Sequence, residues 1–208
     1  MDYKLNEINQ LTEFQHDALR EIANIGFGNA ATSLSKLVNN EVSINIPALK
    51  MQLIEKVPGI VGGEESLVYG IVMQIYGDLN GYIMMLLPTE SVKSISSILL
   101  NYENGDLLSE MNMSMMQEVG HILGGTYVSS LSDFFNMKIS VSPPYATYDM
   151  AAAIIDLALI EMSRDLEYAL VFDSEMMVKN DIINGKIFTM FDTDSLDQIM
   201  NRIDKMVM

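Results

Sequence analysis

The stretch DALREIANIGFGNAATSLSKLVNNEVSINIP, residues 17–47, returns in altered form as SMMQEVGHILGGTYVSSLSDFFNMKISVSPP, residues 114–144. Each position of the second copy lies 97 residues after its counterpart, from the first residue (17 to 114) to the last (47 to 144). A repeat of this length does not arise from general amphipathicity, so the sequence predicts an internal duplication. The copies place polar residues at three matching positions, which are Asp17, Glu21 and Asn24 in the first copy and Ser114, Glu118 and His121 in the second.

The duplication extends beyond these stretches. The segment GYIMMLLPTESVKSISSIL, which begins at Gly81, parallels GKIFTMFDTDSLDQIMNRI, which begins at Gly185, so the offset has grown to 104. The second half therefore carries seven additional residues between Pro144 and Gly185 (104 minus 97). We predict one domain over residues 1–208, with a first repeat at about 11–101 and a second at about 106–208.

Hydrophobic periodicity predicts two long helices, at residues 11–38 and 107–135. Thr12 with Gln15 three positions later forms a capping-box pattern at the start of the first helix, and Asn39-Asn40 suits its end. Gly26 and Gly28 cost this helix about 1 kcal/mol each relative to alanine, and we expect them to admit another helix at close range. The predicted amphipathic stripe of the first helix consists of Leu11, Phe14, Ala18, Ile22 and Ile25, with Asn29 as a polar interruption.

Shorter elements follow each long helix. Strands are predicted at residues 42–53, 66–76, 82–87, 138–141, 167–173 and 186–191, and helices at 89–100 and 195–207, with loops at 58–63 and 101–106. Residues 148–162 have helical spacing, although Ala-Ile-Ile within them also suits a strand. The sequence therefore predicts an α/β (α+β) fold, a pseudo-two-fold duplicated domain in which a largely antiparallel sheet packs with two long helices.

Composition excludes several kinds of function. With 12 Lys and Arg against 28 Asp and Glu, the net charge of −16 disfavours binding to nucleic acid and to anionic membranes. Cysteine is absent and only two histidines occur, so we expect no disulfide and no metal site. The N-terminus MDYKLNEINQ lacks the features of a signal peptide, and the apolar stretches are too short to span a membrane. We expect a cytoplasmic protein.

Asp17, Glu21 and Asn24 are spaced by four and three residues, which places them on one face of a helix. A solvated polar stripe has the same spacing. The second copy keeps this face polar and retains the glutamate, which favours a functional interpretation.

Three further features call for an interpretation, namely the GFGNAA segment and the two histidines. GFGNAA at residues 26–31 matches a dinucleotide-binding pattern, but helical periodicity runs through it, whereas that pattern needs a strand before it. His16 is interpreted as a solvated side chain. We interpret His121 as the mark of a second site that decayed after duplication, although an imidazole can also donate a hydrogen bond or act as a base.

The spacing Asp/Ser-x3-Glu-x2-Asn-x22-Pro resembles the signature of the CheC family of chemotaxis phosphatases, which is related to CheX and to the flagellar switch phosphatase FliY. Asp17, Glu21, Asn24 and Pro47 satisfy it. The second copy departs from it at His121, where the family has asparagine.

The resemblance implies dephosphorylation of the aspartyl phosphate of a CheY-like response regulator, which itself supplies the phosphate, Mg²⁺ and a lysine. Glu21 would pair with that lysine and Asn24 would hold the attacking water, with Asp17 in support. In the second, incomplete site, Glu118 and His121 would take these places, with Ser114 in support. No cofactor is expected on this chain.

The resemblance also implies binding of the receptor deamidase CheD, with residues 148–162 as a docking helix. A core helix is the alternative interpretation of that segment. The alternative function is a non-catalytic adaptor that binds CheD or sits in the flagellar switch.

Overall fold

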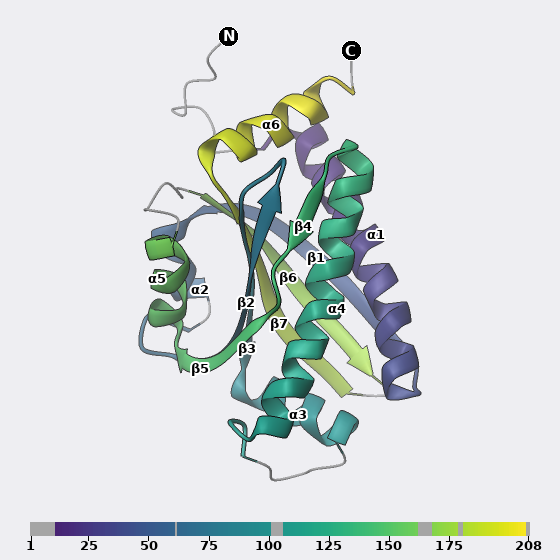
Figure 1. The fold of residues 1–208 in the computed structure, drawn as a ribbon, viewed down its shortest axis with the longest axis vertical. Coiled ribbons are helices and arrows are strands. Elements are labelled where there is room, and N and C mark those ends of the chain that lie inside the picture. Colours follow the sequence, from purple (N-terminus) through teal and green to yellow (C-terminus); the bar gives the residue numbers. More distant parts are fainter. Residues whose placement is uncertain (1–10, 61, 101–105, 162–167, 179–180, 207–208) are drawn as a thin grey trace.

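The computed structural model describes residues 11–60, 62–100, 106–161, 168–178 and 181–206. Its helices and strands form a curled sheet with helices on both faces (Figure 1). In chain order the elements are α1 (Glu13–Val38), β1 (Val42–Leu53), the 3₁₀ helix η2 (Ile54–Lys56), α2 (Val57–Ile60), β2 (Leu67–Gly77), β3 (Gly81–Pro88), α3 (Thr89–Leu100), α4 (Glu110–Phe135), β4 (Ile139–Val141), β5 (Tyr145–Met150), α5 (Ala151–Glu161), β6 (Tyr168–Val178), β7 (Asp181–Phe191) and α6 (Thr193–Asp204).

The bounds of the long helices α1 and α4 follow the duplication. Both have 26 residues, and both bounds of α4 lie 97 positions after those of α1. The predicted capping box is present, since Thr12 and Gln15 exchange side-chain and backbone hydrogen bonds of 3.0 and 3.2 Å. Both helices end at an asparagine with φ of 50°, Asn39 and Asn136, a left-handed conformation that asparagine tolerates. The second helix begins at residue 110 rather than 107 because Ser109 caps it.

The sheet interleaves the two copies. In the described part of the chain it has seven strands in the order β1-β6-β7-β3-β2-β4, with β5 also pairing with β2, and every recorded pairing is antiparallel. The hairpins β2–β3 and β6–β7 meet at the centre through β3 and β7. The prediction of a largely antiparallel sheet packed with two long helices is confirmed.

The strand after α4 is a broken copy of β1. The bounds of β1, shifted by 97, are the start of β4 and the end of β5 (42 to 139 and 53 to 150). In β1 the pairing with β6 changes register between Asn45 and Ala48, around Pro47, and in the second copy Pro143 and Pro144 divide the strand. Proline cannot donate to the ladder, so both copies lose regular pairing at the same place.

This broken strand corrects one prediction. Residues 148–150 belong to β5 rather than to the start of a helix, because they pair with Leu67–Tyr69 of β2. The short elements η2 and α2 follow β1, α2 reaches into the predicted loop at 58–63, and β6 and β7 extend beyond the predicted strands. Parts of the predicted elements and loops, at residues 61, 101–105, 162, 167 and 207, lie outside the described residues.

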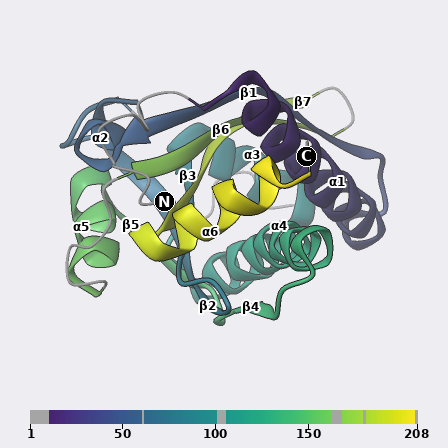
Figure 2. The same ribbon diagram turned by 90° about the horizontal axis from the view of Figure 1, so that it is seen from above.

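The sheet separates two apolar cores. One lies between the sheet and the helices α1 and α4, and the other lies between the opposite face and α2 with α5. Figures 1 and 2 show α1 and α4 side by side and antiparallel, with α6 at one end of the pair and α3 at the other. Side-chain bonds fix these ends: Gln15 Nε2 donates to Asp204 of α6 at 2.9 Å, and Ser96 of α3 bonds Asn112 of α4.

The two long helices touch closely at Gly26. A Cβ atom on Gly26 would lie 2.8 Å from the Cα atom of Tyr127, and the neighbouring Phe27 ring stacks on the Tyr127 ring with centroids 5.3 Å apart. The predicted close approach is therefore confirmed at Gly26. It is wrong for Gly28, where a Cβ atom would meet nothing within 4 Å. No helix of the described chain is long and apolar enough to cross a membrane.

Candidate functional site

The predicted polar face lies on the outer surface of α1. Asp17, Glu21 and Asn24 are all exposed, while the opposite face of the helix is buried. Asp17 accepts a hydrogen bond of 3.2 Å from Arg20. Within the described chain, Glu21 and Asn24 have no recorded hydrogen bond or ion pair, so their polar atoms are available to a partner.

Packing holds this face in place. The buried side of α1 presents Leu19, Ile22 and Phe27, all at most 1% exposed, to the sheet and to α4. The imidazole Nε2 of His16 lies 3.1 Å from the carbonyl oxygen of Leu49, which ties the first turns of α1 to β1. His16 is therefore half-buried and bonded, and its interpretation as a solvated side chain is wrong.

The second copy presents Ser114, Glu118 and His121 on the outer face of α4, all exposed. His121 borders a hollow of about 490 Å³ between the helix pair and β4. Polar side chains supply much of its lining, among them Asn29, Ser33, Thr126, Ser129 and Asp133. The hollow offers hydrogen-bonding groups, and position 121 contributes an imidazole to it rather than the carboxamide of the signature spacing.

The structure keeps the two polar sets apart. Gly26, two positions after Asn24, faces Tyr127 and Ser130 of α4, whereas His121 shares its hollow with Asn29 and Ser33. These two residues lie five and nine positions beyond Asn24, which is about 8 to 14 Å along the helix. The antiparallel pair thus carries two separate polar surfaces.

Apolar side chains flank the candidate site, and the sequence pattern placed them wrongly. Phe14 and Ile25 belong to the predicted amphipathic stripe, yet they are 43% and 47% exposed. The buried face includes smaller residues such as Ala23, Gly26 and Ala30, and Gly26 meets α4. Ile25 lies beside Asn24 on the surface, so the site combines polar groups with an apolar contact. The small residues Gly26 and Ala30 were the signal in the sequence that this side of the helix faces inward.

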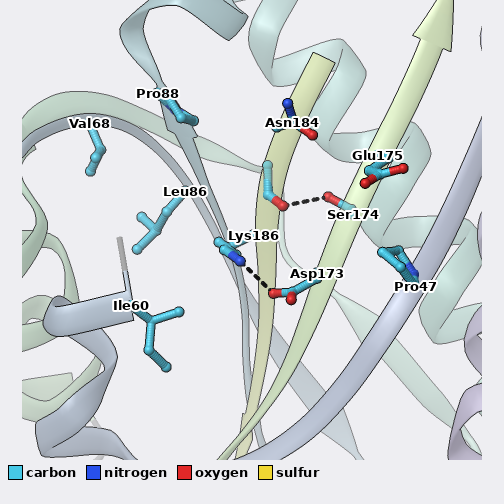
Figure 3. A pocket seen from close by; sticks show the side chains of 11 residues that line it. Pro47, Ile60, Val68, Leu86, Pro88, Asp173, Ser174, Glu175, Asn184 and Lys186 are labelled. Atoms are coloured by element: carbon cyan, nitrogen blue, oxygen red, sulfur yellow. Dashed lines mark hydrogen bonds and ion pairs between the residues drawn. The ribbon is translucent and has the colours of Figure 1, made fainter. Parts of the chain in front are cut away.

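Another hollow, of about 330 Å³, lies on the sheet face opposite α1 and α4 (Figure 3). Lys186 of β7 reaches Asp173 of β6 across it, with Nζ and Oδ1 2.5 Å apart, and Leu86 and Ile60 form apolar walls. Of the predicted motif it includes Pro47 alone, so it is distinct from the polar face of α1.

The fold raises the pKa of three described side chains, those of Tyr69, Tyr127 and Asp197. Burial raises the pKa of Tyr69 to about 12, and burial also raises the pKa of Tyr127 against a smaller opposing effect of Thr189. Burial, followed by the nearby Asp194, raises the pKa of Asp197 on α6. Among the described residues, His, Asp and Glu do not gather in groups of three that could hold a metal ion.

A comparison with known protein families finds the same repeat. The profile of the CheC-like family matches residues 14–51 and 111–148, two segments separated by the same 97 positions, and the first contains Glu21 and Asn24.

Relatives are similar along nearly the whole chain. The CheY-P phosphatase CheC of Bacillus subtilis (strain 168) is 28% identical over 197 residues, covering 92% of this chain and 94% of that protein. The flagellar motor switch phosphatase FliY of the same organism is 24% identical over 212 residues, covering 95% of this chain and 52% of that protein. The crystal structure of Thermotoga maritima FliY has the same fold, with a TM-score of 0.73 at 20% identity, covering 94% of this chain and 98% of that chain.

The profile thus finds both copies of the repeat, and the similarity to CheC runs from end to end of each protein. In both copies of its repeat, the chain is similar to the CheC-like family.

Proposed function

We propose that this protein hydrolyses the aspartyl phosphate of a CheY-like response regulator. The observation that carries the proposal is the placement of Glu21 and Asn24, which lie exposed on the outer face of a helix whose other side is buried, without a recorded partner among the described residues. The similarity to a CheY-P phosphatase along 92% of the chain supports the same activity.

In the proposed mechanism the outer face of α1 docks on the phosphorylated site of the regulator. Glu21 pairs with a lysine of the regulator and fixes the orientation of docking. The Asn24 carboxamide, which has both a donor and an acceptor, holds a water in line with the phosphorus without any need to titrate. Phosphoryl transfer depends chiefly on such positioning and on electrostatic stabilisation, and Mg²⁺ carried by the regulator supplies charge neutralisation.

Asn24→Ala tests the proposal. We expect the rate of dephosphorylation to fall by about 10²–10³, as for the loss of one positioned donor, because the water loses its anchor while the exposed position leaves the fold intact. The measurement is the decay of a phosphorylated CheY-like regulator with and without the protein, together with the thermal midpoint of the variant. An undiminished rate at an unchanged midpoint would refute the assignment.

An adaptor role is the second candidate, and α5 is the feature that favours it. Leu157 and Ile160 of this helix are 39% and 67% exposed, although Ile154 and Ile155 are buried against the sheet. We propose that this outer face is where CheD docks. The same decay assay separates the two functions, since a pure adaptor leaves the phosphorylated regulator to decay at its own rate, with or without CheD.

A further inference from the structure

The glycines within the two long helices fall into two groups. Cβ atoms on Gly26 and Gly120 would come within 2.8 and 2.5 Å of Tyr127 and Ile71, and one on Gly124 would meet the flexible end of Met73, so packing inside the chain accounts for glycine at these three positions. A Cβ atom on Gly28 or Gly125 would meet nothing within 4 Å. Packing within the described chain therefore gives no reason for glycine at these two positions.

Gly28 and Gly125 occupy the same place in the two copies. They are 97 positions apart, and each lies four residues after the polar residue of its site, Asn24 or His121. Glycine in a helix interior costs stability relative to alanine, because it loses more conformational freedom on folding. Both copies therefore bear the stability cost of a glycine that packing does not explain. This points to a requirement from outside the chain.

The position of Gly28 shows what its missing side chain leaves open. Glu21, Asn24 and Gly28 follow one another at steps of three and four, and all three are exposed, so they form one line along α1. Helical side chains lean toward the N-terminus, over the preceding turn. A side chain at position 28 would therefore lean toward Asn24 and fill the space beside its carboxamide.

We propose that Gly28 is a positioning residue whose bare backbone gives the phosphate-bearing loop of the regulator room to reach Asn24. This inference rests on the proposed function. The occupant is the backbone of that loop with its phosphoryl group, which must come within hydrogen-bonding distance of a water held by the carboxamide. Ile25, 47% exposed and adjacent to Asn24, supplies an apolar contact beside the same space.

Gly28→Ala and Gly28→Gln test the inference on the full chain. Thermal midpoints are measured together with kcat and KM for a CheY-like regulator phosphorylated by acetyl phosphate. We expect both variants to keep or raise the midpoint, since the site is open and both residues favour a helix more than glycine does. We expect kcat/KM to fall about tenfold for alanine and further for glutamine, because the larger side chain covers more of the space. Lys36→Ala, in the last turn of the same helix, is the control and should leave both quantities nearly unchanged.

The possible outcomes separate this inference from the proposed function. If Asn24→Ala loses activity while both Gly28 variants keep the full rate, the space beside Asn24 is not needed and the inference fails alone. If Asn24→Ala also keeps the full rate, the proposed function fails. A lowered midpoint for Gly28→Ala would show that the glycine serves the fold, which likewise overturns the inference.

Discussion

Asn24 and His121 occupy the same place on two helices whose bounds match, and they differ in chemistry. Both side chains are exposed on 26-residue helices, one turn after a glutamate. A carboxamide presents a donor and an acceptor in one plane at every pH, whereas an imidazole changes its hydrogen-bonding groups as it titrates. The proposed chemistry therefore favours the first copy, although the two backbones are alike.

Substitutions at His121 test this asymmetry. We expect His121→Ala to leave the dephosphorylation rate nearly unchanged, because the first site carries the activity. His121→Asn completes the signature in the second copy and should raise the rate, to about twofold if the two sites become equal. The measurement is regulator decay at equal protein concentration. A large loss of rate in His121→Ala would instead show that the imidazole contributes to dephosphorylation.

The contact between α1 and α4 is the element on which both polar surfaces depend. It is close because Gly26 brings the backbone of one helix against the backbone of the other, and the rings of Phe27, Tyr127 and Phe172 then pack beneath the crossing. A shift of either helix would tilt its outer face relative to the sheet. Small residues at the crossing therefore fix the direction in which Glu21 and Asn24 point.

Gly26→Ala should weaken this contact. The new Cβ atom would lie 2.8 Å from the Tyr127 Cα atom, which cannot move aside as a flexible side chain can. We expect the free energy of unfolding to fall by about 1–3 kcal/mol, more than the gain of about 1 kcal/mol from helix propensity. Urea unfolding measures the change, with Gly28→Ala as the matched control in open space. Equal stabilisation of both variants would contradict the close contact.

Across the whole molecule, buried hydroxyls set a limit on stability at high pH. Tyr69 and Tyr127 are fully buried, and neither hydroxyl makes a well-formed hydrogen bond in the described structure, although Thr189 acts on that of Tyr127. Burial raises both pKa values, to about 12 for Tyr69, so the unfolded chain loses these protons first as pH rises above about 10. The stability that goes with their neutral forms is therefore present below that pH and is lost as the pH rises toward the folded-state pKa.

The double variant Tyr69→Phe and Tyr127→Phe should resist alkali. Removing these two hydroxyls keeps the rings, so stability near neutral pH should be equal or higher. Between about pH 9 and pH 11 the variant should lose less stability than the unmodified protein, as measured by urea unfolding at each pH. Tyr76→Phe, at an exposed tyrosine, is the control. An equal loss in the double variant would show that these hydroxyls do not govern alkaline stability.

Much of this molecule could be predicted from local pattern. The bounds of α1 follow from the capping residues Thr12 and Asn39, and the copy at 97 positions transfers them to α4. β5 was missed because its strand breaks at Pro143 and Pro144 and runs directly into the helix at Ala151. Shifting β1 by 97 would have revealed it.

The candidate site could be predicted in its polar part only. Glu21 and Asn24 follow from the signature spacing, and their exposure follows from the helix. Ile25 and Phe14 could not be assigned to the surface, because apolar periodicity does not say whether large or small residues meet the neighbouring helix. The close contact with α4 is made through Gly26, and those two larger side chains lie outside it.

The interleaved strand order has a consequence for how such a chain could arise. β1 of the first copy pairs with β6 of the second, and β4 of the second pairs with β2 of the first. A single copy alone would leave its first strand without its neighbour and its hairpin with a bare edge. An ancestral gene that encoded one copy would thus have needed two identical chains exchanging strands. Fusion of two such chains would let the two copies differ, as they do at Asn24 and His121.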